Sequence, residues 1–105
     1  MDAKAENLAE SIDYQNGAVV SRTLVKKASG NVTLFAFDRG EGLSEHTTPF
    51  DALVHILDGE AEITIGGINH TVGAGEAILM PAEVPHALKA ASRFKMLLTM
   101  IKSEK

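Results

Sequence analysis

His46 and His86 are the residues of this chain whose type and setting best suit chemistry. Each follows a glycine-rich break and enters a segment with the composition of a β-strand. An imidazole can bind a metal ion, and it can act as a general base near neutral pH. Two strands of one barrel can aim both rings at a single point. Spacing alone does not favour a shared site, because two histidines of an ordinary protein usually have separate roles.

A metal-free role is open to the same pair. Together with the nearby Thr48 hydroxyl, the two rings would form a polar patch in an apolar pocket. Such a patch orients a small ligand or takes a proton from it. The competing interpretation is that the rings are satisfied by water or by each other and bind nothing. We expect the other two histidines outside the pocket, since His55 lies at an odd offset from Ala52 and His70 follows a hairpin turn.

Apolar residues alternate along two further segments. Phe35 and Phe37 share one face of an early strand, and residues 94, 96, 98 and 100 share one face of the last strand. Core packing explains this pattern, and an adaptable pocket wall also explains it, because methionine fills irregular space. In a barrel whose interior is the pocket, the same residues can both pack the core and line the pocket. The candidate pocket residues are therefore His46, Thr48, His86, Phe35 and Met96.

The elements that would position these residues are short strands. We expect them at residues 18–26, 32–37, 53–57, 61–65, 68–72, 77–80, 85–90 and 94–101. Gly66-Gly67 predicts a two-residue hairpin, and Asp58-Gly59-Glu60 predicts a turn between two strands. We expect residues 1–17 to form an arm, either a frayed tail or a short helix with one small apolar stripe, and residues 18–105 to form the domain. Many short strands without a long amphipathic helix indicate an all-β sandwich or barrel.

The totals exclude several classes of protein. The chain has 105 residues, which suits one domain, and 45% of them are hydrophobic. The net charge is −4 and no basic run occurs, so we expect no nucleic-acid partner. The absence of cysteine removes disulfides and thiolate metal sites and fits a reducing compartment. The charged N-terminus and the lack of a long apolar run favour a cytoplasmic protein without a membrane partner.

Two glycine-rich motifs give the chain a resemblance to the cupin family. In the first motif, Gly40, His46 and Gly59 match, while Thr48 stands at a second histidine position and Ala52 at a glutamate position. In the second motif, Gly75, Pro81 and His86 match, while Glu83 stands at a glycine position and Ala90 at an asparagine position. The resemblance covers roughly residues 30 to 101. It implies a small, single-domain, RmlC-like cupin: a double-stranded β-helix, or jelly-roll barrel, behind a short N-terminal arm.

The residues that depart from these motifs reduce the number of metal ligands that the chain can supply. Cupin metals are usually held by three histidines and a glutamate, whereas His46 and His86 are the two ligands that remain here. Threonine is a poor ligand and alanine is none. A carboxylate from Glu45 or Asp51 could substitute only across a bulge, because neighbouring side chains of a strand point to opposite faces. We therefore expect no cofactor, or a weakly bound zinc, nickel, iron or manganese ion.

Apolar residues on both faces of the strand at 53–57 imply burial on both sides. A chain this short does not easily cover a second face, so we expect a homodimer that packs sheet on sheet or exchanges the N-terminal strand. The resemblance also implies a dimer, because small cupins are commonly dimeric.

The leading hypothesis is a protein that binds a small organic ligand in its barrel beside a degenerate metal site. The alternatives are a metal-dependent dioxygenase or isomerase and a regulatory or partner-binding dimer with a vestigial pocket, so catalysis stays open.

Overall fold

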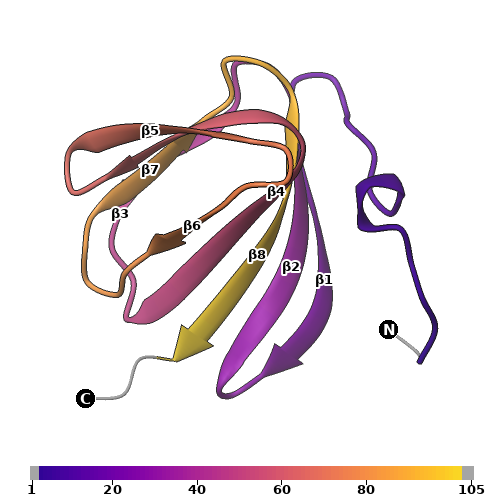
Figure 1. Cartoon of the computed structure of the whole chain (residues 1–105), viewed down its shortest axis with the longest axis horizontal. Coiled ribbons are helices and arrows are strands. Elements are labelled where there is room, and N and C mark those ends of the chain that lie inside the picture. The colour runs from indigo at the N-terminus through magenta and orange to yellow at the C-terminus, as the bar shows by residue number, and fades with distance from the viewer. Residues whose placement is uncertain (1–2, 103–105) are drawn as a thin grey trace.

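A computed structural model describes residues 3–102 of the chain, and these residues form an all-β domain (Figure 1). A short 3-10 helix, η1, spans Leu8–Glu10. The strands are β1 (Val19–Lys27), β2 (Gly30–Phe37), β3 (Gly42–His46), β4 (Phe50–Ile65), β5 (Ile68–Gly73), β6 (Ala77–Met80), β7 (His86–Lys89) and β8 (Phe94–Lys102). Within this range no helix is long and apolar enough to cross a membrane. The expected all-β class is confirmed.

The strands form two antiparallel sheets that share β4. The first sheet has the order β1-β2-β8-β4-β6, and the second has the order β3-β7-β4-β5. The N-terminal half of β4 pairs with β8 and β6, and its C-terminal half pairs with β7 and β5. Figure 1 shows the sheets curling around a common interior with β4 running through both. Because neighbours in space are often far apart in sequence, the chain crosses repeatedly between the sheets, as in a jelly roll.

The prediction of a turn at Asp58-Gly59-Glu60 was wrong. β4 continues through these residues, with a register shift against β8 between Ile56 and Asp58. Gly59 has a φ of 74°, and a Cβ atom there would overlap the carbonyl oxygen of Arg93. An irregularity of this kind bends a strand without ending it. The Asp-Gly signal therefore marks the bend at which β4 leaves one sheet for the other.

The two-residue hairpin at Gly66-Gly67 is confirmed. β4 ends at Ile65 and β5 begins at Ile68, and the two residues pair directly. The glycines between them have φ values of 57° and 82°, which is the pattern of a type I′ turn. This turn sets the register of the β4–β5 pair.

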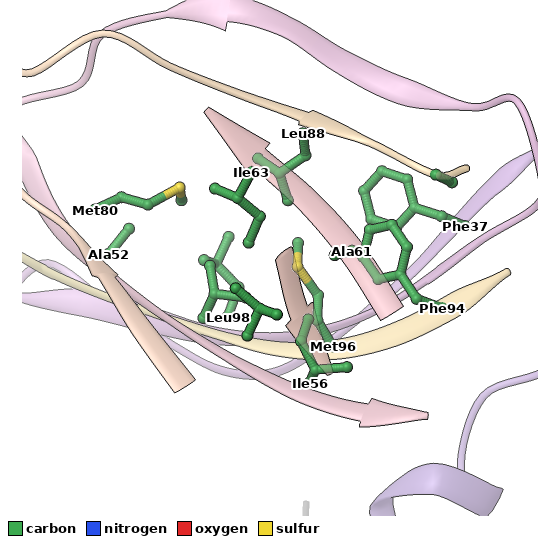
Figure 2. Close-up of a cluster of buried hydrophobic side chains, with 13 residues drawn as sticks. Phe37, Ala52, Ile56, Ala61, Ile63, Met80, Leu88, Phe94, Met96 and Leu98 are labelled. Carbon is green, nitrogen blue, oxygen red and sulfur yellow. The ribbon is translucent and has the colours of Figure 1, made fainter. Parts of the chain in front are cut away.

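The interior between the sheets is filled with apolar side chains (Figure 2). Phe37 and Phe94 stack there, with ring centroids 4.4 Å apart. Met96, a candidate pocket residue, is fully buried in the same cluster, whereas the other candidate, Phe35, is half-buried at its edge. The alternating pattern of β2 and β8 thus supplies core residues, and their packing fixes how the two sheets face each other.

The N-terminal arm covers part of the outer face of the first sheet. Ile12 is 6% exposed and packs with Leu34 and Ala36, which are fully buried beneath it. Leu8 and Tyr14 of the arm join the same cluster, so the apolar stripe expected in the arm has a partner. β1 begins at Val19, next to the boundary expected between arm and barrel.

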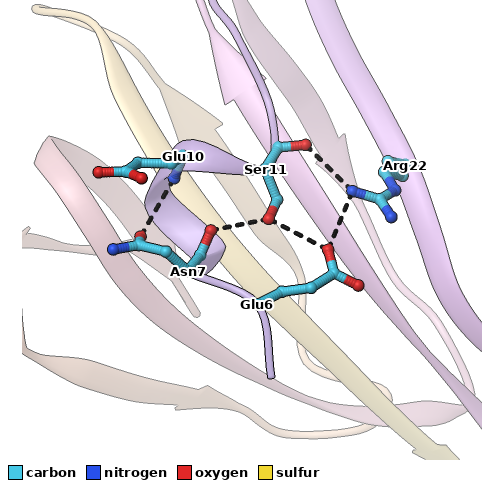
Figure 3. A network of polar contacts seen from close by, with 5 residues as sticks. All are labelled: Glu6, Asn7, Glu10, Ser11 and Arg22. Carbon is cyan, nitrogen blue, oxygen red and sulfur yellow. Dashed lines mark hydrogen bonds and ion pairs between the residues drawn. The ribbon is translucent and has the colours of Figure 1, made fainter. Parts of the chain in front are cut away.

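Polar contacts fix the arm at its N-terminal end (Figure 3). Arg22 of β1 forms an ion pair with Glu6 at 3.3 Å and donates a hydrogen bond to the carbonyl oxygen of Ser11 at 3.2 Å. The Ser11 hydroxyl donates to the Glu6 carboxylate at 3.2 Å and to the carbonyl oxygen of Asn7 at 2.7 Å. Because the Arg22 side chain is 46% exposed, its ion pair with Glu6 contributes little, and we attribute most of the arm's attachment to its apolar residues.

Candidate functional site

The structure brings His46 and His86 together. They are directly paired residues of β3 and β7, and their ring centroids lie 4.4 Å apart with an interplanar angle of 66°. A register shift in β3 between Leu43 and His46 restores the pairing at the end of that strand. The two rings therefore meet edge to face at one end of the second sheet. The convergence predicted for the two histidines is a feature of this fold.

Both rings have one nitrogen engaged by the backbone. Nδ1 of His46 lies 2.8 Å from the carbonyl oxygen of Ser44, and Nδ1 of His86 lies 3.3 Å from the carbonyl oxygen of Val84. A carbonyl oxygen only accepts hydrogen bonds, so each contact places the ring proton on Nδ1. In the neutral form of each ring, Nε2 is then unprotonated. That atom can accept a hydrogen bond from a ligand or bind a metal ion.

The two histidines differ in burial. His46 is exposed, while His86 is only 4% exposed. Burial lowers the pKa of His86, and the neighbouring His46 lowers it further, against the opposing effect of the hydrogen bond to Val84. The lowered pKa favours the neutral form of His86, which supplies an acceptor from inside the site, with His46 at its edge.

Thr48 shapes the loop beside the histidines. Its hydroxyl donates to the carbonyl oxygen of Phe50 at 3.1 Å and accepts from the Phe50 amide at 3.2 Å. Its carbonyl oxygen accepts a hydrogen bond from the Glu83 amide at 2.8 Å. Glu83 takes a φ of 66°, which side chains other than glycine rarely adopt. The segment after β6 is thus tied to the segment before β4, next to the histidine pair.

The donor set does not fit a resident metal centre. Across residues 3–102 no group of three or more histidine, cysteine, aspartate or glutamate side chains could hold a metal ion. Ala52 is buried and offers no donor, and Asp51 accepts a hydrogen bond from the Ala82 amide at 2.9 Å. The register shift needed for Glu45 to substitute does occur in β3, but Glu45 is exposed. Two imidazoles alone leave a metal ion mostly coordinated by solvent.

The remaining two histidines differ in burial. His55 is exposed on the outer face of the first sheet, as expected from its offset to the buried Ala52. His70 is half-buried in β5 and pairs with Ile63, whose side chain is fully buried. Neither of them lies with the pair at the end of β3 and β7.

A hollow that the sequence reasoning missed lies on the outer face of the second sheet. Its volume is about 740 Å³, and neither histidine of the pair lines it. Gly40, Gly42 and Ala87 contribute little side chain, while Glu62 and Lys89 stand on directly paired positions of β4 and β7. Hydrogen bonds from Asn69 and Thr71 lower the pKa of Glu62. The small residues Gly42 of β3 and Ala87 of β7, on two neighbouring strands, are the signal that could have revealed it.

Comparison with known proteins tests the resemblance. A family model described as a cupin domain matches residues 33–102. A conserved protein of unknown function from Streptococcus pyogenes is 40% identical, has a TM-score of 0.93, and is matched over 100% of this chain and 92% of that one. A cupin superfamily protein from Desulfitobacterium hafniense is 30% identical, has a TM-score of 0.91, and is matched over 98% of this chain and 94% of that one.

A longer relative contains a similar barrel. A cupin 2 conserved barrel domain protein from Leptotrichia buccalis is 44% identical with a TM-score of 0.90, and the match covers 92% of this chain but 47% of that one. No curated protein gives a significant match. The family model covers more than half of the chain, and two relatives of at least 30% identity match it along nearly their whole length. This chain therefore belongs to the cupin family.

Proposed function

We propose that this cupin binds a small organic ligand at the end of the barrel where β3 and β7 meet. The observation that carries the proposal is the pairing of His46 and His86 with both Nδ1 atoms held by backbone carbonyl oxygens. Two fixed acceptors at a partly buried position suit a ligand that carries O–H or N–H donors on a small apolar body.

The surroundings support such a ligand. Ile65 of β4 is paired with His86, is half-buried and packs against the core cluster. The side chains of Met80 and Ala52 are buried in the same cluster. A ligand anchored by the imidazoles would have Ile65 beside His86 and solvent beside the exposed His46. Burying its apolar part contributes about 25 cal/mol for each Å² removed from water.

A metal-dependent activity is the second candidate, and one observation favours it. A histidine that binds a metal through Nε2 usually donates its Nδ1–H to a carbonyl oxygen, as both rings do here. The incomplete donor set argues against tight binding. We therefore expect divalent metal ions to bind weakly and to exchange freely with solvent.

Two measurements on the same proteins separate the candidates. The first is elemental mass spectrometry of protein purified without chelators or a polyhistidine tag. The second is a thermal-shift screen of small alcohols, phenols and amides. Both compare the wild type with the variants His46→Ala and His86→Ala. His55→Ala is the matched control, because His55 is exposed on the far side of the first sheet.

We expect far less than one metal ion per chain, and a ligand whose stabilising shift is retained in the His55→Ala control and lost in both site variants. A near-stoichiometric metal that disappears in both site variants would overturn the proposal in favour of the metal-dependent candidate. A ligand that stabilises the site variants as strongly as the wild type would place binding elsewhere.

A further inference from the structure

Two rows of paired residues cross the outer face of the second sheet at the hollow of about 740 Å³. Paired residues of neighbouring strands point to the same face, and the residues between these rows, Ile63 and Leu88, are buried in the barrel. The first row contains Gly42 of β3, Lys89 of β7, Glu62 of β4 and Thr71 of β5. The second row contains Ala87 of β7, Thr64 of β4 and Asn69 of β5. The face over the hollow is therefore polar, with charged groups in one row and neutral groups in the next.

Glu62 and Lys89 stand side by side in the first row, yet they do not neutralise each other. Directly paired residues of antiparallel strands have Cβ atoms about 5 Å apart, which is close enough for an ion pair. The Glu62 carboxylate instead accepts hydrogen bonds from the Asn69 amide at 2.8 Å and from the Thr71 hydroxyl at 3.0 Å, both on the β5 side. Among the ion pairs within residues 3–102, none involves Lys89. The hollow thus contains a fixed negative charge and a separate positive charge on neighbouring strands.

Neutral polar groups line the hollow on one side of the charged row. They are the hydroxyls of Ser44 and Thr64 and the side-chain amide of Asn69. Ala87 lies directly beside Thr64 and leaves space above β7, because its side chain is a single methyl group. Hydroxyl and amide groups can each donate and accept hydrogen bonds, so they suit a ligand group that does both. The hollow therefore complements a molecule with opposite charges at one end and a neutral polar group at the other.

A second carboxylate, that of Glu41, lines the opposite end of the hollow. Glu41 precedes β3, and its carbonyl oxygen accepts a hydrogen bond from the Ala90 amide just after β7 ends. Glu41 therefore lies beyond the charged row, on the side away from Thr64. Glu62 is directly paired with Lys89, whereas Glu41 is one residue out of register with it. We therefore assign the role of anion beside Lys89 to Glu62.

We propose that this hollow binds a free α-amino acid with a polar, uncharged side chain. The ammonium group of the amino acid binds the Glu62 carboxylate, and its carboxylate binds the Lys89 ammonium group. Its side chain extends over Ala87 and forms hydrogen bonds with Thr64 and Asn69. The volume of the hollow lies in the range of small-molecule sites. The inference goes beyond the proposed function, because neither histidine of the pair lines this hollow.

Two-dimensional NMR of the isotope-labelled chain tests the site, with L-glutamine as the probe. As L-glutamine rises to about 20 mM, we expect saturable shifts of the backbone amides of Glu62, Asn69 and Lys89. N-acetyl-L-glutamine lacks the ammonium group and L-glutaminamide lacks the carboxylate, so each should bind about tenfold more weakly or worse. Equal binding of the three compounds would overturn the proposal. The same holds for the absence of any saturable shift, or for shifts gathered around His46 and His86 instead.

Variants without one of the two charges test the assigned roles. Glu62→Gln and Lys89→Met should each weaken L-glutamine binding about tenfold, and both should fold, because neither side chain belongs to the core. Glu60→Gln is the matched control, since Glu60 is exposed on the same strand but does not line the hollow. Lys89→Met should also lose the preference for L-glutamine over L-glutaminamide, which a merely structural role of Lys89 would not change. Unchanged affinity in both variants, or a greater loss in Glu41→Gln than in Glu62→Gln, contradicts the assignment.

Discussion

At the scale of single residues, Glu83 is where residue type and backbone conformation disagree. Its φ of 66° lies in the region that favours glycine, and it occupies the motif position at which cupins have glycine. A side chain in this conformation costs about 1 kcal/mol relative to glycine. Its amide is nevertheless fixed by the carbonyl oxygen of Thr48, so the loop imposes the conformation on the residue. The loop beside the histidine pair thus carries a small conformational strain.

Replacement of this residue should relieve the strain. We expect Glu83→Gly to raise the free energy of unfolding by about 0.5–1 kcal/mol, measured by urea denaturation. Ala82→Gly is the control in the same loop. Ala82 has no positive φ, so there glycine should lower the stability by adding freedom to the unfolded chain. A loss of stability in Glu83→Gly would show that the glutamate side chain contributes more than its conformation costs.

At the scale of elements, β4 joins the two halves of the barrel. Its first half belongs to one sheet and its second half to the other, and Gly59 lies at the bend between them. The carbonyl oxygen of Arg93 approaches the backbone of Gly59 so closely that no side chain fits. A residue with a Cβ atom would have to separate β4 from the start of β8. The site depends on this bend, because the second half of β4 pairs with β7 and so positions His86.

Substitution at the bend should therefore be costly. We expect Gly59→Ala to lower the free energy of unfolding by about 3 kcal/mol, from both the steric overlap and the positive φ. Gly67→Ala isolates the second effect, since Gly67 has a φ of 82° but nothing within 4 Å of an added Cβ atom. It should cost about 1 kcal/mol. Equal losses in the two variants, measured by chemical denaturation, would mean that the close approach of Arg93 is unimportant.

At the scale of the whole molecule, several large apolar side chains stay exposed on the folded chain. One cluster fills the barrel, and a second lies between the arm and the first sheet. Leu53 and Leu79, which are paired on β4 and β6, lie outside both clusters and are 42% and 50% exposed. If a second copy covered this surface, folding stability would depend on protein concentration. The second copy would bind the folded chain but not the unfolded chain, and such binding stabilises the folded state.

Thermal unfolding checks that dependence. If two copies associate through this face, a hundredfold rise in protein concentration should raise the melting temperature by about 5 °C. Leu53→Asp should melt at the same temperature across that range. Differential scanning fluorimetry with intrinsic or added dye measures both. A concentration-independent melting temperature in the wild type would argue that the folded chain is monomeric.

The sequence by itself determined the local and repeating features. Alternation in β2 and β8 identified their inward faces, Gly66-Gly67 identified the hairpin, and the two glycine-rich motifs predicted that His46 and His86 share a site. These features depend on residue types at fixed spacings, so local backbone geometry is enough to predict them.

The tertiary structure alone decided how those segments meet. Asp58-Gly59-Glu60 has the composition of a turn, yet the packing of Arg93 against Gly59 makes it a bend within one strand. Met96 could have lined a pocket, and its neighbours from both sheets place it in the core. One row of paired residues crosses five strands and joins Val25, Val32, Thr99, Leu53 and Leu79, which lie far apart in the sequence. Register between distant strands arises from the whole packed barrel, so no short stretch of sequence contains it.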